Sequence, residues 1–363
     1  MKITQVACYF SSGIFYVRVD TEEGVSGYGE CSRMNNEAVL ALVRTVIAPA
    51  VIGMSVFDGE RIEEKVMTRN YKISGQLLAM AYSGVEMAIW DAKAVYLGQP
   101  IYNLLGGSYR DRVDAYGSSL QRDLGIEEEA ERLKEAAVTL KLRAVKIKTG
   151  PRMGRGPAEL KRDAAKVKRV RKELGPDIEL MVDGNSSYTY MQAVQLFHMI
   201  EDCRLYHYEE PCPYDDVEAY VKLANRLPVP IHVGEQDWNL YTFREFIARG
   251  ACHYYAVDAV KCGGFANAMR ATVLCKAFGI QYVPHNTSQG IGLAATLQLA
   301  ATVPHFGGYV EYRILSEDHG SQYLADKLQL LDGGFRIPDG PGLGIRMDHE
   351  RMDKELQQVV FRP

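Results

Sequence analysis

The hydrophobic pattern of the chain changes at about residue 110. Residues 1–30 alternate between apolar and polar positions, and this period of two predicts β-strands joined by glycine-containing turns. From Asn36 to Tyr96 the apolar residues recur at helical spacing. We therefore predict a domain of mixed α+β structure over residues 1–110.

Beyond that point, short apolar runs alternate with longer helical stretches. The runs that predict strands lie at 112–118, 143–148, 179–183, 205–209, 230–235, 254–258, 280–285 and 308–311. The stretches that predict helices lie at 127–140, 158–174, 190–202, 214–226, 240–249, 266–278 and 290–302. Eight strands separated by seven helices favour a (β/α)8-type, TIM-like barrel over residues 111–329, because no glycine fingerprint of a dinucleotide-binding sheet follows the first strand. An eighth helix is not clearly indicated, and residues 330–363 are expected to return to the first domain. The predicted fold class is thus α/β, a barrel with an N-terminal α+β capping domain.

Composition narrows the function classes. The net charge of −4 gives no reason to expect nucleic acid or an acidic membrane surface as a partner. The N-terminus lacks the apolar core of a signal peptide, and no run approaches membrane-spanning length. The seven cysteines contain no Cys-x-x-Cys pair, which is typical of reduced, buried thiols in a cytoplasmic protein.

Three carboxylates stand at equal intervals in the barrel region. Asp183, Glu209 and Glu235 are 26 residues apart, and each closes a short apolar run. This interval is about one strand-plus-helix unit, so we expect the three acids at the same end of successive parallel strands. Taken singly, each acid would be interpreted as a solvated loop residue, but together they suit a hard cation such as Mg²⁺, which prefers oxygen ligands.

Two lysines occur on one face of a predicted strand. Lys146 and Lys148 lie in Ala-Val-Lys-Ile-Lys, two residues apart among apolar neighbours. Lysines that face a barrel interior are costly unless they meet anions, such as metal-site acids or a substrate carboxylate. Burial and a nearby cation lower the pKa of an amine, which suits one of the two to act as a base. The alternative is that both point outward to the helical shell.

A second acid–base pair is expected on the far side of the barrel. Asp258 and His285 end consecutive predicted strands, and a carboxylate that binds one imidazole nitrogen fixes the tautomer of the ring. Asn185, two residues after Asp183, and Glu311, at the end of the last strand, are candidates for substrate contacts or for simple loop capping. Strand alternation predicts that Glu210 points away from its neighbour Glu209. The run Lys261-Cys262-Gly263-Gly264 lacks the spacing of a phosphate loop and predicts a turn into the next helix.

These motifs, in this order, resemble the enolase superfamily and within it the mandelate racemase group. The resemblance covers nearly the whole chain. It rests on Ile89-Trp90-Asp91, Leu104-Leu105-Gly106-Gly107, Lys146-Ile147-Lys148, Asp183, Glu209-Glu210-Pro211, Gly234-Glu235-Gln236, Asp258 with Lys261-Cys262-Gly263-Gly264, His285, Glu311 and Pro338-Asp339-Gly340-Pro341-Gly342-Leu343-Gly344. One departure is the long, cationic loop at 150–157, which could reach the site and alter which substrate fits. A second is the connection between His285 and Glu311, whose length could move Glu311 from its expected place.

The resemblance implies one Mg²⁺ per subunit at Asp183, Glu209 and Glu235, a small carboxylate substrate and a homo-oligomer. Lys146 would polarise the substrate carboxylate, Lys148 would remove the α-proton, and His285, oriented by Asp258, would act on the opposite face. We expect dehydration of an acid sugar, an aldonate or aldarate, to a 2-keto-3-deoxy acid. The alternatives are a racemase or epimerase of a 2-hydroxy acid, and a non-catalytic binding or scaffold protein.

Overall fold

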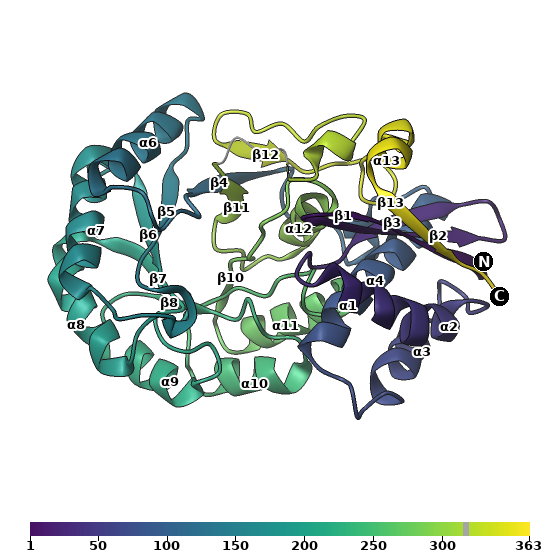
Figure 1. The fold of residues 1–363 in the computed structure, drawn as a ribbon, viewed down its shortest axis with the longest axis horizontal. Helices are drawn as coiled ribbons and strands as arrows, with labels where there is room; N and C mark the ends of the chain where they lie inside the picture. Colours follow the sequence, from purple (N-terminus) through teal and green to yellow (C-terminus); the bar gives the residue numbers. More distant parts are fainter. Residues whose placement is uncertain (315–318) are drawn as a thin grey trace.

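A curled sheet of eight parallel strands forms the centre of the larger part of the molecule (Figure 1). The computed structural model describes residues 1–314 and 319–363. The strands are β4 (Arg112–Ser118), β5 (Ala144–Lys148), β6 (Glu179–Asp183), β7 (Leu205–Glu209), β8 (Ile231–Val233), β9 (Tyr254–Tyr255), β10 (Gln281–Tyr282) and β11 (Tyr309–Arg313). They neighbour one another in chain order, and β11 returns to pair with β4. The amide of Tyr282 donates to His305 O (3.0 Å), and that of Gly307 donates to Tyr282 O (2.9 Å), so the last gap of the sheet closes. The predicted barrel is confirmed.

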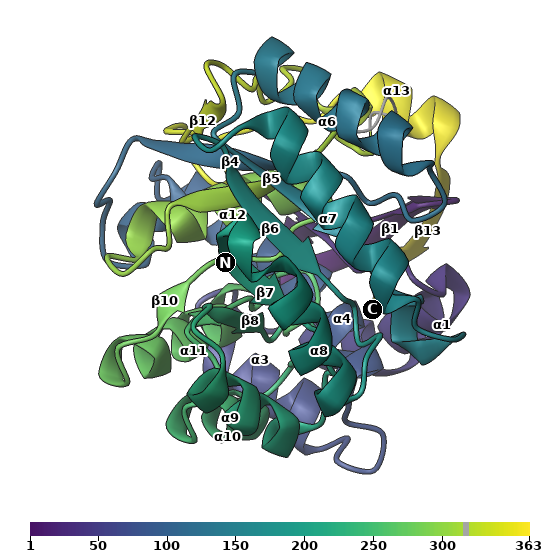
Figure 2. The same cartoon turned by 90° about the vertical axis from the view of Figure 1, so that its left-hand side faces the viewer.

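Helices cover the outside of this barrel, and Figure 2 shows α6, α7 and α8 lying over the strands. They are α6 (Ile126–Thr139), α7 (Leu160–Leu174), α8 (Tyr190–Ile200), α9 (Val217–Arg226), α10 (Leu240–Ala248), α11 (Phe265–Ala277) and α12 (Ile291–Thr302), with short 3-10 turns η3 (Arg152–Gly154), η4 (Glu201–Cys203) and η5 (Ser321–Tyr323). Within the described residues, no α-helix follows β11 until α13 (His349–Glu355). None of the described helices combines the length and the apolar character that a membrane span requires.

The N-terminal residues form a separate antiparallel sheet in the order β13-β1-β2-β3. Its strands are β1 (Ile3–Ser11), β2 (Ile14–Thr21), β3 (Ser26–Glu30) and β13 (Gln357–Phe361). The sheet is accompanied by α1 (Asn36–Leu42), the π-helical turns η1 (Val43–Ile47) and η2 (Glu64–Thr68), α2 (Ala48–Val51), α3 (Gly59–Glu63), α4 (Gln76–Tyr96) and α5 (Ile101–Leu104). The C-terminal strand β13 pairs with β1, which brings the two ends of the chain together (Figure 1). Strand β12 (Gly334–Arg336) pairs antiparallel with β4. The α+β capping domain is thus present, and 1–110, 111–329 and 330–363 remain the proposed boundaries.

The central cap helix α4 lies against β3 at very short range. A Cβ atom on Gly27 would come within 2.2 Å of Ala88 O, and one on Gly29 within 1.9 Å of Gly84 O. Only glycine allows this approach of backbone to backbone. The two glycines therefore set how closely the helix that faces the barrel sits on its own sheet.

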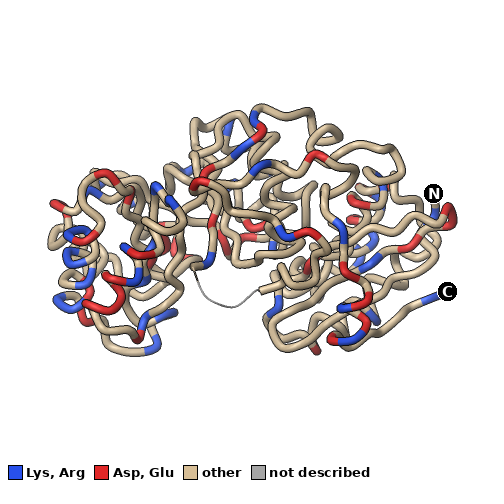
Figure 3. The backbone as a smooth tube through the Cα atoms, turned by 90° about the horizontal axis from the view of Figure 1, so that it is seen from above, with Lys and Arg blue, Asp and Glu red and all other residues tan. Residues whose placement is uncertain are grey.

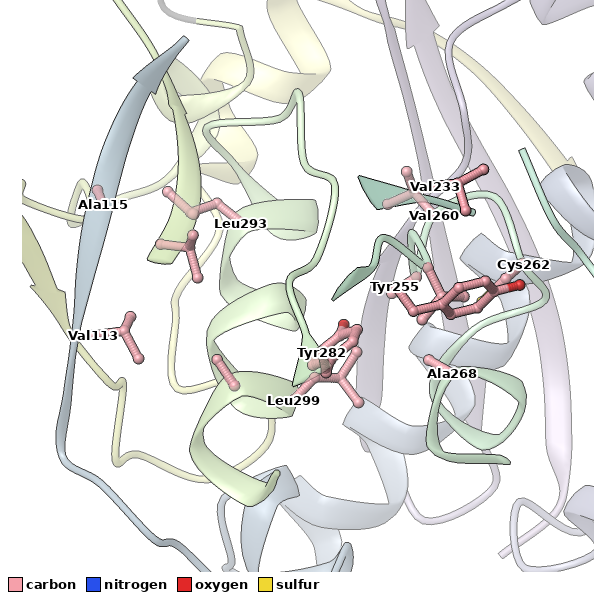
Figure 4. Packing of buried hydrophobic residues seen from close by; sticks show 14 of the residues in the cluster. Val113, Ala115, Val233, Tyr255, Val260, Cys262, Ala268, Tyr282, Leu293 and Leu299 are labelled. Atoms are coloured by element: carbon pink, nitrogen blue, oxygen red, sulfur yellow. The ribbon is translucent and has the colours of Figure 1, made fainter. Parts of the chain in front are cut away.

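Helix α12 is buried on every side, unlike the amphipathic outer helices. It packs against β4 and β11 of the barrel and against β3 and α5 of the N-terminal part. In Figure 4, Leu293 points from α12 toward Ala115 of β4, and Leu299 lies beside Tyr282 of β10. All seven cysteines are free and buried, several of them in this core.

Buried acids join the N-terminal part to the barrel. Glu86 of α4 accepts hydrogen bonds from the amides of Phe265 (2.7 Å) and Ala266 (3.0 Å), at the first turn of α11, and from Trp90 Nε1 (2.7 Å). Glu30 at the end of β3 binds the start of α12 in a similar way. Helix N-termini carry unpaired N–H groups, so these carboxyl groups satisfy donors that burial would otherwise leave unpaired.

Replacing Glu86 with Gln is expected to lower the free energy of unfolding by about 1–3 kcal/mol, because an amide cannot accept all of these hydrogen bonds. It should also change the pH dependence. Burial raises the pKa of Glu86 from 4.5 to about 7. The unfolded chain therefore releases this proton before the folded chain does, and the stability that Glu86 contributes falls as pH rises from about 4.5 to 7.

Urea unfolding at several pH values between 4.5 and 8 tests this expectation. In the wild type, Glu86 should make the free energy of unfolding fall by up to about 1.4 kcal/mol for each pH unit between its unfolded and folded pKa values. In the E86Q variant this part of the fall should be absent. Glu131→Gln on the exposed side of α6 is the matched control and should behave as the wild type. Parallel pH profiles of E86Q and wild type would contradict the expectation.

Candidate active site

The three equally spaced carboxylates meet at the carboxyl end of the barrel strands. Asp183 and Glu209 are paired residues at the ends of β6 and β7, and Glu235 follows β8 by two residues. One oxygen of each lies within 4.8 Å of the others, and all three side chains are buried. The parallel strands thus bring the three acids together at one end of the barrel, as their equal spacing in the sequence predicts.

Hydrogen bonds leave specific oxygens of this cluster open. Glu209 Oε2 accepts from Lys146 Nζ (2.8 Å) and lies 3.2 Å from His232 Nδ1, whereas its Oε1 is buried without a partner. Glu235 Oε1 accepts from Gln236 Nε2 (2.7 Å). Three adjacent buried carboxylates repel one another, and an unpartnered oxygen among them is costly. The donor set, all hard oxygens, therefore fits a cation such as Mg²⁺.

The pKa shifts describe the same electrostatic conflict. Burial, followed by the charge of Glu209, raises the pKa of Asp183. Burial also acts to raise the pKa of Glu235, but the positive charges of His285 and Lys261 outweigh it and lower this pKa to about 2. The cations near Glu235 thus favour its ionised form, whereas burial and the charge of Glu209 disfavour that of Asp183.

The two lysines of β5 both face this cluster, yet they differ in access. Lys148 Nζ contacts Asp183 Oδ2 and lines an open cavity. Lys146 is fully buried and lies 3.2 Å from Glu311 Oε1 in addition to its contact with Glu209. Burial lowers the pKa of Lys146, but the carboxylates around it, first Glu209 and then Glu311, raise it well above its ordinary value. Lys146 is therefore a fixed positive charge, whereas Lys148 is the lysine that a bound molecule can reach.

The predicted pair on the other side is formed. His285 Nδ1 lies 2.6 Å from Asp258 Oδ2, and Asp258 Oδ1 accepts from the Val260 amide (2.8 Å). The other ring nitrogen, Nε2, lies 3.2 Å from Glu235 Oε2. Burial lowers the pKa of His285, but the charge of Glu235 and the hydrogen bond to Asp258 raise it above its ordinary value overall. This ring is thus oriented with one nitrogen toward the carboxylate cluster.

The two predicted substrate-contact residues have different surroundings. Asn185 lines the cavity, but its side chain already donates to Asp183 Oδ2 (3.2 Å) and accepts from Arg122 Nη2 (2.6 Å). Glu311 is fully buried and accepts from the Asn286 amide (3.3 Å). The shared register Glu311↔Tyr116 between β11 and β4 fixes its position.

A cavity of about 350 Å³ opens over these groups. Of the predicted residues, Lys148, Asn185, Glu235 and His285 line it, whereas Lys146, Asp183, Glu209, Asp258 and Glu311 do not. Its remaining polar lining includes Glu30, Arg33, Arg152, Lys261 and Arg313. A molecule in the cavity can therefore reach one candidate base on each side, Lys148 and His285. Of the three clustered carboxylates, only Glu235 belongs to the lining.

Sequence reasoning missed two residues close to the cluster. Lys261 Nζ lies 3.4 Å from Glu235 Oε1 and 4.0 Å from Asp258 Oδ2. Its position three residues after the strand-end acid Asp258 is the feature of the sequence that could have indicated a place in the site. Glu210 is buried with neither oxygen partnered, and burial, followed by the charges of Glu235 and Asp183, raises its pKa well above its ordinary value. β7 ends at Glu209 and Glu210 itself has a φ of +34°, so the predicted orientation of Glu210 away from Glu209 stays a prediction.

A capped barrel with carboxylates at successive strand ends, and with Lys and His–Asp groups on either side, is the architecture of the enolase superfamily. The family model "Enolase C-terminal domain-like" matches residues 126–351, and "Mandelate racemase / muconate lactonizing enzyme, N-terminal domain" matches residues 7–106. The chain belongs to this superfamily, in its mandelate racemase group.

Individual relatives are similar over nearly their whole length. A D-galactarolactone cycloisomerase from Agrobacterium fabrum is 29% identical, with 93% of this chain and 89% of the relative covered. An arabinonate dehydratase from Saccharolobus solfataricus is 27% identical, with 91% and 87% covered. The crystal structure of a mandelate racemase/muconate lactonizing protein from Paracoccus denitrificans, complexed with magnesium, matches with a TM-score of 0.94 at 30% identity, covering 99% of both chains.

Proposed function

We propose that this chain is a Mg²⁺-dependent hydro-lyase that converts an acid sugar, an aldonate or aldarate, to a 2-keto-3-deoxy acid. The observation that carries the proposal is that Lys148 and His285 line one cavity beside a cluster of buried carboxylates. Relatives named arabinonate, D-galactonate and D-gluconate dehydratase support it. The small-molecule partner is a sugar carboxylate, and a homo-oligomeric state stays a prediction.

Asp183, Glu209 and Glu235 would hold one Mg²⁺ per subunit. When bound, this ion supplies positive charge that makes the proton beside a carboxylate more acidic and stabilises the charge left behind. Glu209 Oε1 and Glu235 Oε2 are buried without a hydrogen-bond partner and could therefore serve as ligands.

The chain's own residues would then move two protons. Lys148 Nζ would first release a proton and leave Asp183. As the neutral amine it would then take the α-proton of the substrate, and the electron pair would pass into the carboxylate as an enediolate. The enediolate collapses and expels the β-hydroxyl group, which accepts a proton from His285 Nε2 and leaves as water. Asp258 keeps His285 Nδ1 protonated, so that Nε2 is the nitrogen that transfers the proton. The enol product gains a proton at C3 and releases the proton of its C2 hydroxyl group to solvent, which gives the 2-keto-3-deoxy acid.

Three further residues have supporting roles in this proposal. Lys146 supplies a fixed positive charge beside Glu209, toward the expected position of the substrate carboxylate. Asn185 holds both oxygens of Asp183 through its amide groups and can also contact substrate. Glu311 neutralises Lys146 and lies 3.9 Å from His285 Nε2, so it can orient a substrate hydroxyl group.

Proton NMR in D₂O with Mg²⁺ tests the proposal across aldonic, aldaric and simple 2-hydroxy acids, with sugar lactones as a further set. The expected result is the signal of a 3-deoxy-2-keto product from at least one acid sugar. Epimerisation or α-deuteration without loss of water would replace dehydration by the racemase alternative. Isomerisation of lactones alone would favour a cycloisomerase, the activity for which the Agrobacterium relative is named. Complete inactivity on every compound would favour a binding protein.

A further inference from the structure

Two arginines that line the cavity, Arg33 and Arg152, form no ion pair with an acidic side chain of the described residues, although Arg33 is close enough to Glu30 for its charge to oppose the rise in the pKa of that carboxyl group. Arg33 Nη1 lies 3.3 Å from the ring nitrogen Nδ1 of His319, and the guanidinium group forms no ion pair with any described residue. The Arg152 side chain likewise has no ion pair or hydrogen bond within the described part of the chain. Both arginines line the same cavity as Lys148 and His285.

The other charged groups of the lining already have partners. Lys148 contacts Asp183, and Lys261 is close to Glu235. Glu30, the remaining acid, accepts from Ser288 Oγ (2.7 Å) and from the Gly292 amide (2.8 Å). Arg313, which also lines the cavity, donates to Thr287 O (3.2 Å). Among the described residues, Arg33 and Arg152 are therefore the lining cations that a bound anion can pair with.

The two arginines are more exposed to solvent than the reacting groups are. Lys148, Glu235 and His285 are only 6%, 4% and 5% exposed and form the floor of the cavity. Arg33 is half-buried and Arg152 is exposed, so both lie nearer to solvent. A molecule whose carboxylate lies on the floor would therefore extend its far end toward Arg33 and Arg152.

Local contacts hold the Arg152 segment beside the site. The amide of Met153 donates to Asn185 O (2.8 Å), which ties η3 to the loop after β6. Arg33 enters from the N-terminal sheet, three residues after β3 ends at Glu30. Two guanidinium groups from separate elements thus reach one cavity, and guanidinium groups bind carboxylates through paired hydrogen bonds.

We propose that the substrate is a dicarboxylate, an aldarate rather than an aldonate, whose second carboxylate binds Arg33 and Arg152 at the mouth of the cavity. This inference rests on the proposed dehydration and narrows its substrate class. An aldonate places a neutral hydroxymethyl group at the same point, which leaves both guanidinium groups without an ion pair among the described residues. The long loop at 150–157 then has a function, since it carries one of the two arginines that select the substrate.

The test compares a hexarate with the hexonate of the same configuration, using Mg²⁺-loaded enzyme. The wild type is expected to show at least a tenfold higher kcat/KM for the hexarate. Arg152→Gln and Arg33→Gln should each reduce this ratio by roughly tenfold, mainly through KM, as expected for loss of one charge-assisted hydrogen bond. Arg155→Gln is the matched control, because Arg155 belongs to the same loop but lines only a neighbouring hollow.

Calorimetric binding to a Lys148→Ala variant keeps the inference testable if turnover fails. That variant should bind the hexarate more tightly than the hexonate, and adding Arg152→Gln should remove the difference. A wild type that prefers the hexonate, or equal selectivity in the Arg152 and Arg155 variants, would overturn the inference while leaving dehydration intact. Absence of product from both acids would count against the proposed reaction, and the binding comparison would then decide the dicarboxylate inference by itself.

Discussion

Replacing Lys148 with Ala is expected to abolish both α-proton exchange with solvent and formation of the keto-deoxy product. Lys148 is the only lysine of β5 that lines the cavity, since Lys146 lies sealed behind it. A positioned general base contributes about a hundredfold to ten-thousandfold to a rate. Loss of this base from the first step should therefore reduce turnover by at least that range, measured by NMR in D₂O with an acid sugar that the wild type converts.

The fold should survive this substitution. Alanine removes the ammonium group that contacts Asp183 but leaves the backbone pairing of β5 with β6 unchanged. Circular dichroism and Mg²⁺-induced thermal shifts should match the wild type closely. Lys168→Ala, on the exposed face of α7, is the control for removal of a lysine and should retain full exchange. Wild-type exchange in the Lys148 variant would refute the assignment of the base.

Removing divalent cations is expected to eliminate activity and to lower stability. The buried oxygens of Asp183, Glu209 and Glu235 lie within 4.8 Å of one another, and a bound cation relieves their repulsion only in the folded state. Binding to the folded state alone adds about 2.7 kcal/mol of stability at a hundredfold excess over Kd. Thermal unfolding of chelator-treated protein should therefore shift upward by several degrees when Mg²⁺ is added.

The Glu209→Gln variant should lose this Mg²⁺-dependent shift, because it removes the charge of the carboxylate whose Oε1 is unpartnered. Glu245→Gln, an exposed acid of α10, provides the matched control and should show the full shift. Stability and activity that are indifferent to both chelator and added Mg²⁺ would remove the metal assignment. A shift of equal size in both variants would place the ion elsewhere.

The barrel was predictable because its pattern is local and repeated. Each predicted strand overlaps an observed one, and the predicted helices match the observed ones to within about three residues. The last strands are shorter than expected, as β9 covers Tyr254–Tyr255 and β10 covers Gln281–Tyr282. The residues between these short strands and Asp258 and His285 are joined by separate hydrogen bonds, such as the one that His285 N donates to Ala256 O (3.3 Å). They do not form a regular strand ladder.

Residues whose surroundings depend on distant segments were less predictable. Alternation along a strand predicted that Glu210 points away from Glu209, and this stays a prediction, because β7 ends at Glu209 and Glu210 has a φ of +34°. The buried state of Lys146 depends on Tyr116 and Glu311, which come from other strands. The role of Glu30 depends on Ser288, 258 residues away in the chain.

The sequence by itself determined the fold family, the strand-end positions of Asp183, Glu209 and Glu235, and the shared face of Lys146 and Lys148. These follow from period and register, because a side chain's direction in a regular strand depends only on its place in that strand. Only the tertiary structure decided that Lys148 lines the cavity while Lys146 does not, and that Arg33 and Arg152 line the same cavity. Access and charge pairing result from contacts between segments far apart in the chain, and no local pattern encodes those contacts.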